Sequence, residues 1–538
     1  MPNYLTTDTE GPHNANVHLA SSMKQLIAML ITTMVLALAA CGEGSISGGG
    51  EAPVLIYAPK TPMVKISLSA TKVAVNVPLT ISWVSTDATT CVGSDALSAT
   101  QPVSGSVSVT HSKGGAYTYS ITCAGVGTSA TSKATVIVPM EVYATSYENK
   151  NLINFDQTQV PTVRALGIAN VVSGEQDSID RSIAFGDFFQ EGKYSAFVMA
   201  SVSDGAYGPN LPGNIPGVGY FLDQDNSGKW VDRSSELFKA ISDRRGCISP
   251  SYTAVADFNI DSRPDIYIAC TGVDFLIPGA TVEQNQAAGR SFSVLYLSQS
   301  DGTYKSRRVE ESNPMYGHKA AALDINGDRN IDIITTDIID PSQPIGCGAP
   351  YVLLGRGDGT FTRDYRFIDQ NILRNALSLC GMFNVDIIPI DGRYDIMVGG
   401  MVNTNTGSGL WNVFWAKGTR NGFDFSSGKI LHMPVDTITS SDFQFPLDII
   451  YDAKTAGFYM KTTGTNFSKG TNWAVLKFDL NGMFVNVVDT WFNATANFQP
   501  TSPQFKLSQS NPGYLLAYTG GCSADVSKGE CGRQVTLR

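Results

Sequence analysis

The stretch Ser251–Thr271, SYTAVADFNIDSRPDIYIACT, combines an alternating strand pattern, an acidic turn and a short apolar run. Residues 318–338, HKAAALDINGDRNIDIITTDI, repeat this arrangement 67 residues further along the chain. Alternation and short apolar runs bounded by turn residues are typical of β-strands. The two copies therefore predict a repeat protein whose unit begins with strand, acidic turn and strand.

Each acidic turn carries a set of oxygen ligands that suits calcium. Calcium takes about six to eight oxygens, which three Asp, one Asn, a backbone carbonyl and water supply, whereas magnesium demands a stricter geometry. By position, the carbonyl donors are Arg263 and Asn330. We expect about two calcium ions, and the predicted ligands are Asp257, Asn259, Asp261, Arg263 and Asp265 in one loop and Asp324, Asn326, Asp328, Asn330 and Asp332 in the other. The alternative is a solvated turn whose carboxylates only cap backbone N–H groups.

A third copy, RSIAFGDFFQEGKYSAFVMAS, precedes the other two and places Asp187 70 residues before Asp257. Weaker copies follow near Asp391, Asp452 and Gln509, and a second hairpin with a Gly turn lies downstream of each of the first four. Four strands every ~60–70 residues are the period of a propeller blade. We predict six blades, with seven as the alternative, and expect an outer strand from residues 141–180 to complete the short last repeat.

These repeats resemble the FG-GAP/VCBS propeller repeats of integrin α-subunits and many bacterial surface proteins, strongly over two repeats and loosely over the rest. The resemblance implies that the acidic loop joins strands 1 and 2 of a blade and binds calcium. In the first repeat the corresponding residues are Asp187, Phe189, Glu191 and Ser195, and the fourth keeps only Asp391 and Asp395. We therefore expect two sites rather than six. The segment Asp223–Gly228 is similar to a calcium loop, but its place in the repeat predicts a plain turn.

The amino-terminal region predicts a lipid-anchored protein. From Met23 a Lys is followed by an apolar run of about 15 residues that ends in Leu-Ala-Ala-Cys41, which is short for a membrane-spanning helix and typical of a signal peptide. This ending resembles the lipobox of bacterial lipoproteins, which implies acylation of Cys41; Gly42 in place of Asp favours the outer membrane. We interpret residues 1–22 as an over-extended start, 23–40 as the signal peptide and 41–62 as a flexible tether.

Residues 63–140 predict a small β-sandwich, because short alternating runs are separated by Gly, Asp and Ser turns. Tyr119, Ile121 and Cys123 share one face, so Cys91 can meet Cys123 across the core. The segment resembles bacterial immunoglobulin-like modules in architecture, although Trp83 precedes the first Cys. The remainder, 141–538, is assigned to the propeller, so that the whole fold class is all-β.

Cysteine usage fits an oxidising compartment. The chain has nine Cys, and an even number remains once Cys41 carries lipid. Sequence neighbours suggest four bridges, although spacing alone does not establish connectivity. The suggested pairs are Cys91–Cys123, Cys247–Cys270, Cys347–Cys380 and Cys522–Cys531.

The loops that join strands 2 and 3 should emerge opposite the calcium loops, and they are long and rich in Gly and Pro. We expect them at 201–217, 271–290, 337–350, 401–410 and 461–472, and binding residues concentrate on such loops of rigid scaffolds. The candidate ligand-binding residues are Tyr207, Asn210, Phe275, Asn403, Asn405, Asn466 and Phe467. The alternative is a set of variable solvent loops.

The net charge of −10 and the absence of a Lys/Arg cluster argue against nucleic acid. No G-x-S-x-G, H-E-x-x-H or P-loop pattern occurs, so we expect binding rather than catalysis. The favoured hypothesis is a calcium-stabilised surface lipoprotein that recognises an extracellular glycan or protein and meets the membrane only through its lipid. The alternatives are a periplasm-facing scaffold and a polysaccharide hydrolase or lyase.

Overall fold

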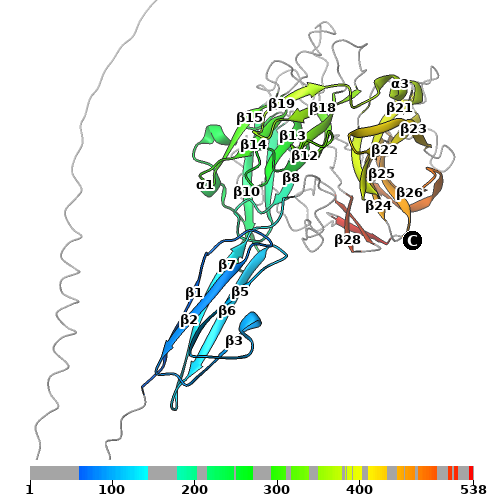
Figure 1. The fold of residues 1–538 in the computed structure, drawn as a ribbon. Coiled ribbons are helices and arrows are strands. Elements are labelled where there is room, and N and C mark those ends of the chain that lie inside the picture. Colours follow the sequence, from blue (N-terminus) through cyan, green and yellow to red (C-terminus); the bar gives the residue numbers. More distant parts are fainter. Residues whose placement is uncertain are drawn as a thin grey trace, which may run out of the picture. The chain divides into compact units, whose positions relative to one another are not determined.

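The protein is described here from a computed structural model. Strands dominate it throughout (Figure 1). No helix within the described ranges has the length and apolar character needed to cross a membrane. The structure describes residues 60–142, 179–202, 215–247, 250–270, 292–309, 317–337, 349–377, 382, 384–390, 392–402, 410–432, 445–452, 455–466, 470–493, 507–511, 514–518 and 532–536.

The first part is a sandwich of two antiparallel sheets. One sheet, in the order β1-β2-β5, consists of β1 (Met63–Leu68), β2 (Leu79–Thr86) and β5 (Ser104–Val109). The other, in the order β4-β3-β6-β7, consists of β3 (Thr90–Gly93), β4 (Thr100–Gln101), β6 (Gly115–Ala124) and β7 (Ser129–Val138), with the short 3-10 turn η1 (Asp95–Leu97) beside it. Inward residues of both sheets, such as Trp83 and Ile121, form one apolar core. The alternation in the sequence therefore predicted the sandwich correctly.

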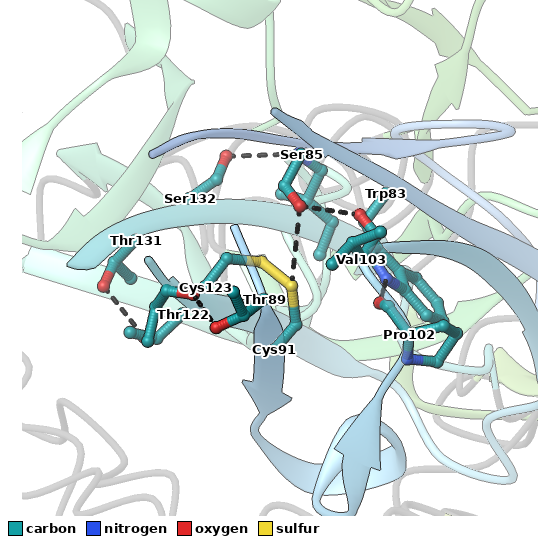
Figure 2. Close-up of a disulfide and its surroundings, with 12 residues drawn as sticks. Trp83, Ser85, Thr89, Cys91, Pro102, Val103, Thr122, Cys123, Thr131 and Ser132 are labelled. Carbon is teal, nitrogen blue, oxygen red and sulfur yellow. Dashed lines mark hydrogen bonds between the residues drawn. A yellow bond between two sulfur atoms is a disulfide. The ribbon is translucent and has the colours of Figure 1, made fainter. Parts of the chain in front are cut away.

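A disulfide joins Cys91 and Cys123 within the second sheet (Figure 2). The two residues are directly paired across β3 and β6, with a Cα–Cα distance of 4.0 Å. The expected pair is therefore confirmed, but the expectation that it crosses the core between sheets is wrong, because both cysteines belong to neighbouring strands. Trp83, on the opposite sheet, donates its Nε1–H to the carbonyl of Pro102 at 2.9 Å and is otherwise buried.

The described residues of the second part form six consecutive sheets, which we call blades 1 to 6. Blades 1 to 5 have four strands and blade 6 has three, and every strand pairs antiparallel with its sequence neighbour. Blade 1 is β8 (Ile179–Gly186), β9 (Ser195–Val202), β10 (Ile215–Gln224) and β11 (Trp230–Asp232); blade 2 is β12 (Pro250–Ala256), β13 (Asp265–Cys270), β14 (Val294–Ser298) and β15 (Tyr304–Arg308); blade 3 is β16 (Gly317–Leu323), β17 (Asp332–Asp337), β18 (Ala349–Gly355) and β19 (Phe361–Asp364).

The later blades follow the same order. Blade 4 is β20 (Asn384–Ile390), β21 (Arg393–Val402), β22 (Leu410–Thr419) and β23 (Gly422–His432); blade 5 is β24 (Phe445–Asp452), β25 (Gly457–Asn466), β26 (Gly470–Asp479) and β27 (Phe484–Asn493); blade 6 is β28 (Leu507–Asn511), β29 (Tyr514–Tyr518) and β30 (Gly532–Thr536). Short helices α1 (Ser234–Leu237), η4 (Ile241–Arg244) and α3 (Gln370–Leu377) interrupt the connections between blades.

Successive blades touch through their first strands, since β8 contacts β12, β12 contacts β16, β16 contacts β20, β20 contacts β24 and β24 contacts β28. This repeated four-stranded arrangement is that of a β-propeller, so the predicted fold class is confirmed. The outer strand expected within residues 141–180 falls largely on 143–178, outside the described residues.

Blades pack face to face, which explains the apolar runs in the sequence. Ile266 and Ile268 of β13 pack into the core shared with blade 1, whereas Tyr267 and Ala269 pack into the core shared with blade 3. All six residues of β13 are buried. A strand covered on both faces has no polar face to show, so a continuous apolar run replaces the alternating pattern.

The segment 461–472 differs from our expectation of a long loop. β25 continues to Asn466 and β26 begins at Gly470, and these two residues pair with each other. Thr and Asn in this segment extend the two strands instead of forming a surface loop. Of the candidate ligand-binding residues, Asn466 is therefore the last residue of a strand, and the other six lie outside the described residues.

Candidate functional site

The ten predicted metal ligands lie in two equivalent loops. Residues 257–264 join β12 to β13, and residues 324–331 join β16 to β17, so each loop connects strands 1 and 2 of its blade. Ile260 and Ser262 have positive φ in the first loop, as do Gly327 and Arg329 in the second. The loop of blade 1 has positive φ at the matching residues Gln190 and Gly192. Three loops thus share one backbone path, and only their side chains differ.

The first aspartate of each loop folds it by accepting backbone N–H groups. Asp257 accepts from Asp261 at 3.0 Å and Ser262 at 2.7 Å. Asp324 accepts from the N–H groups of residues 327, 328 and 329 at 2.8, 3.2 and 2.9 Å. These contacts are those of an Asx-type turn.

The last aspartate of each loop is fully buried and ties the loop to strand 3. Asp265 accepts the N–H of Phe258 and the N–H and Oγ–H of Ser298 at 2.7–2.8 Å. Asp332 accepts the N–H groups of Ile325 and Gly355 at 2.9 and 2.8 Å. Burial raises the pKa of Asp265 to about 7 and that of Asp332 to about 6, and neighbouring loop carboxylates push both in the same direction.

The asparagines face the middle carboxylates. Asn259 donates from Nδ2 to Asp261 Oδ2 at 3.2 Å, and Asn326 donates in the same way to Asp328 at 3.0 Å. The Oδ1 atom of Asn259 is buried and has no hydrogen-bond partner. A buried acceptor without a partner is costly. A cation beside Asp261 would suit that oxygen, because turning the amide would bring Oδ1 to the metal.

Within the described ranges, no three His, Cys, Asp or Glu side chains converge closely enough to hold a metal ion as they stand. The carboxylates face the N–H groups of their own loops instead. The chemistry of the donor set still fits calcium, with three carboxylates, an amide oxygen and a backbone carbonyl in each loop. Binding would require the side chains of Asp261 and Asp328 to turn toward the ion.

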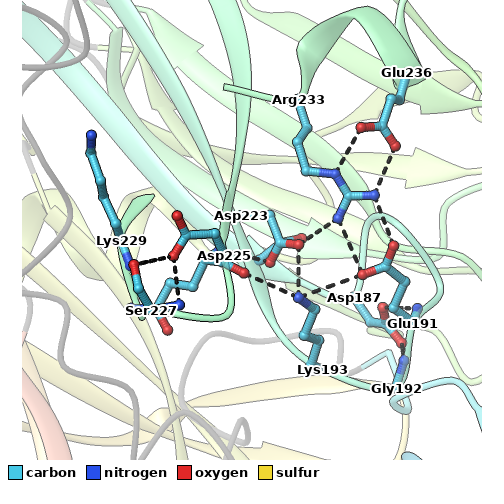
Figure 3. Close-up of polar contacts among 12 residues, drawn as sticks. Asp187, Glu191, Gly192, Lys193, Asp223, Asp225, Ser227, Lys229, Arg233 and Glu236 are labelled. Carbon is cyan, nitrogen blue, oxygen red and sulfur yellow. Dashed lines mark hydrogen bonds and ion pairs between the residues drawn. The ribbon is translucent and has the colours of Figure 1, made fainter. Parts of the chain in front are cut away.

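In blade 1 basic side chains of the protein pair with the acidic groups around the loop (Figure 3). Arg233 forms ion pairs with Glu191 at 2.8 Å and with Asp223, and Lys193 lies 2.8 Å from Asp223. Arg233 lowers the pKa of Glu191 by hydrogen bonding to its carboxylate. The acidic groups around this loop are therefore compensated by two basic side chains.

Blade 4 also pairs its acidic residue with a basic side chain, but the residues differ from those of blade 1. Asp395, which corresponds to Asp265 and Asp332, is fully buried and accepts from Arg393 Nε at 2.8 Å and Trp415 Nε1 at 2.9 Å. Its Oδ1 also accepts the N–H of Gly418, as the buried aspartates of blades 2 and 3 accept from their own third strands. Asp391, the other acidic residue of this repeat, lies outside the described residues.

The loops of blades 2 and 3 differ from these two in charge balance. In the part of the chain that the structure describes, no Lys or Arg forms an ion pair with any of their six aspartates. Arg263 points away, since its Nη2 donates to the carbonyl of Gly302 at 2.7 Å. This position does not reveal the contrast in the sequence, because a basic residue stands two residues before the last ligand position in blades 1, 2 and 4 (Lys193, Arg263 and Arg393), and only blade 3 has Asn330 there.

The Asp223–Gly228 segment is a turn, as predicted. Asp225 accepts the N–H groups of Ser227 and Lys229 at 2.8 and 3.0 Å, and the Ser227 hydroxyl at 2.6 Å (Figure 3). Blade 5 has a comparable turn, in which Asp452 accepts the N–H and hydroxyl of Thr455. Neither turn brings several carboxylates together.

A second disulfide, Cys247–Cys270, agrees with the pairing suggested by the sequence. It links the segment before blade 2 to the end of β13. Cys41 and the cysteines of the other two suggested pairs, Cys347, Cys380, Cys522 and Cys531, lie outside the described residues, so those assignments stay predictions.

The described residues thus define an all-β protein with a two-sheet sandwich followed by a β-propeller that carries acidic loops. No protein-family model and no curated protein matches its sequence. Among solved structures, a protein of unknown function from Dyadobacter fermentans aligns at 10% identity and a TM-score of 0.39, covering 68% of this chain and 98% of that one. The periplasmic gluconolactonase of Pseudomonas aeruginosa aligns at 13% identity and a TM-score of 0.32, covering 68% and 87%. At these values the likenesses carry no argument about function.

Proposed function

We propose that this chain is a calcium-stabilised binding protein, anchored through Cys41 at the outer membrane and exposed at the cell surface. The observation that supports calcium is the charge balance of the loops. Blades 1 and 4 pair their acidic loops with Arg233, Lys193 and Arg393, whereas the three aspartates in each loop of blades 2 and 3 form no ion pair with a Lys or Arg among the described residues. A hard cation would compensate these carboxylates and give the buried Oδ1 of Asn259 a partner.

Calcium would act as a structural tie in this proposal. The residues around each ion are the loop aspartates, and their last members, Asp265 and Asp332, also hold strand 3 of the blade through Ser298 and Gly355. A calcium ion that immobilises the loop would therefore also immobilise the connection from strand 1 to strand 2 and the contact of the loop with strand 3. The ligand recognised by so rigid a scaffold would be an extracellular glycan or a protein.

Two measurements test the proposal. Surface proteolysis of intact cells should degrade the protein; complete protection would instead favour the periplasm-facing scaffold. A screen of purified protein against immobilised glycans and envelope proteins, with calcium or with a chelator, should give calcium-dependent retention without cleavage of the glycan. Release of shortened glycan products would overturn the binding proposal in favour of a hydrolase or lyase.

A further inference from the structure

A pocket of about 360 Å³ lies between blades 3 and 4. One wall is Leu323, Asp324 and Ile325, where β16 runs into its acidic loop, and the other comes from the β20–β21 and β22–β23 turns of blade 4. In an antiparallel blade the turns between strands 1 and 2 and between strands 3 and 4 lie at the same end. The pocket is therefore on the side of the acidic loops, opposite the loops that the sequence favoured for binding.

The charged groups of the pocket balance one another. Arg393 is already paired with the buried Asp395. Asp324 contributes a half-buried carboxylate, and Arg420 contributes an exposed guanidinium that has no hydrogen bond or ion pair within the described residues. With the predicted calcium bound, the three aspartates of this loop keep one net negative charge, which the charge of Arg420 balances, so the pocket favours a neutral ligand.

An aromatic side chain supplies the apolar surface of the pocket and packs against the hydrophobic core. Phe423 lines the pocket, and its ring meets Phe425 edge-on at a centroid distance of 6.3 Å. Phe425 in turn stacks on Phe414 at 5.9 Å with an interplanar angle of 7°. Both belong to the same apolar core of blades 3 and 4. Phe423 therefore presents a rigid ring beside the hydrogen-bonding groups.

We propose that this pocket binds one ring of a neutral sugar. A sugar ring has an apolar face for Phe423 and hydroxyl acceptors for Arg420, whereas Asp324 already accepts three backbone N–H groups and is left to the predicted calcium site. The volume lies at the low end of the range for ligand sites, which suits one or two sugar units. The inference deepens and rests on the proposed glycan-binding function, and it names the site and the ligand class.

Saturation-transfer NMR of the full chain tests this, with glucose, galactose, mannose, arabinose and N-acetylglucosamine as probes and glucuronate as a charged comparison. We expect at least one neutral sugar to give a signal and glucuronate to give less. Arg420→Ala and Phe423→Ala should each raise the Kd of that sugar by about tenfold, the size expected for losing a charged hydrogen bond or an aromatic contact. Arg356→Ala is the matched control, because Arg356 lies in the corresponding turn of blade 3, its guanidinium donates to the Thr362 hydroxyl, and it is outside the pocket.

The possible results separate this inference from the proposed function. Sugar binding that is lost in both pocket variants and kept in Arg356→Ala supports the pocket. Sugar binding that survives in both pocket variants overturns the pocket but leaves a glycan-binding protein. A wild-type protein that gives no signal with any neutral sugar also overturns the pocket, and the glycan and protein screen then decides the proposed function independently. Arg420 is exposed, so its variant should fold, and an unchanged Tm verifies this.

Discussion

Lys319 on the first strand of blade 3 and Asp386 on the first strand of blade 4 form a buried ion pair with an Nζ–Oδ1 distance of 2.6 Å. The two side chains are only 5% and 1% exposed. Lys319 Nζ also lies 4.9 Å from the ring of Tyr252, which has the same position in blade 2. The two contacts of Lys319 therefore link the first strands of three consecutive blades.

Breaking this pair should be strongly destabilising. We expect Asp386→Ala to lower the free energy of unfolding by about 3–5 kcal/mol, because a buried ammonium loses its carboxylate partner. Denaturant unfolding measures the change. Asp301→Ala, which removes the carboxylate facing Lys239 in an exposed pair, is the control and should have a much smaller effect, because solvent screens an exposed pair. Equal effects of the two substitutions would refute the importance of the buried pair.

Calcium should stabilise the propeller through the loops of blades 2 and 3. Extracellular calcium modules bind at about 10⁻⁴–10⁻³ M, so 5 mM calcium should add about 1–2 kcal/mol for each site and raise Tm. Asp261→Ala combined with Asp328→Ala should abolish the rise, because both loops lose a ligand. Differential scanning calorimetry with calcium or a chelator measures it.

Asp225→Ala serves as the control for the calcium experiment, since Asp225 caps an exposed hairpin turn outside the predicted sites. Its protein should respond to calcium like the wild type. A calcium response that persists in the double variant would place the metal elsewhere.

The ion pair in blade 1 should make stability depend on acid pH. Hydrogen bonding to Arg233 lowers the pKa of Glu191 in the folded protein below that of the unfolded chain. Its contribution is therefore fully present above the unfolded pKa and is lost as the pH falls through the folded pKa. Comparing the unfolding of wild type and Glu191→Gln between pH 7 and pH 3 should give a difference that shrinks as the pH falls. A difference that stays constant would argue against the ion pair as its source.

The cysteine pairing can be mapped directly. Peptide mapping of the oxidised protein under non-reducing conditions should recover the Cys91–Cys123 and Cys247–Cys270 linkages. We also expect the predicted Cys347–Cys380 and Cys522–Cys531 linkages and a Cys41 without a disulfide partner. A peptide that joins cysteines of different predicted pairs would contradict the assignment.

The sequence contained enough information for the strand order, because each blade repeats a local pattern of strands and turns. The acidic turns of residues 257–265 and 324–332 also set the repeat boundaries correctly. The ion pairs could not be predicted in the same way. Arg233 reaches Glu191 across 42 residues of sequence, and Lys319 meets Asp386 only because blades 3 and 4 pack against each other. Such contacts depend on the packing between blades, which local patterns do not encode.

The pocket between blades 3 and 4 was missed for a related reason. Its two walls come from segments about 70–100 residues apart, and neither Arg420 nor Phe423 stands in a recognisable motif. The loop expected at 461–472 was wrong because Gly, Thr and Asn are common in turns, yet here strand pairing between β25 and β26 outweighs that preference.

The complete burial of β13 has a consequence for how this protein is made. One apolar face of each blade stays exposed until the following blade has folded. In blade 2 this face includes Tyr267 and Ala269, which residues of β16 cover in the folded protein. A partly synthesised chain therefore exposes an apolar surface that moves forward by one repeat as each blade folds. Such a surface favours aggregation and proteolysis, so we expect an early stop codon anywhere in the repeats to yield a degraded fragment rather than a shorter working protein.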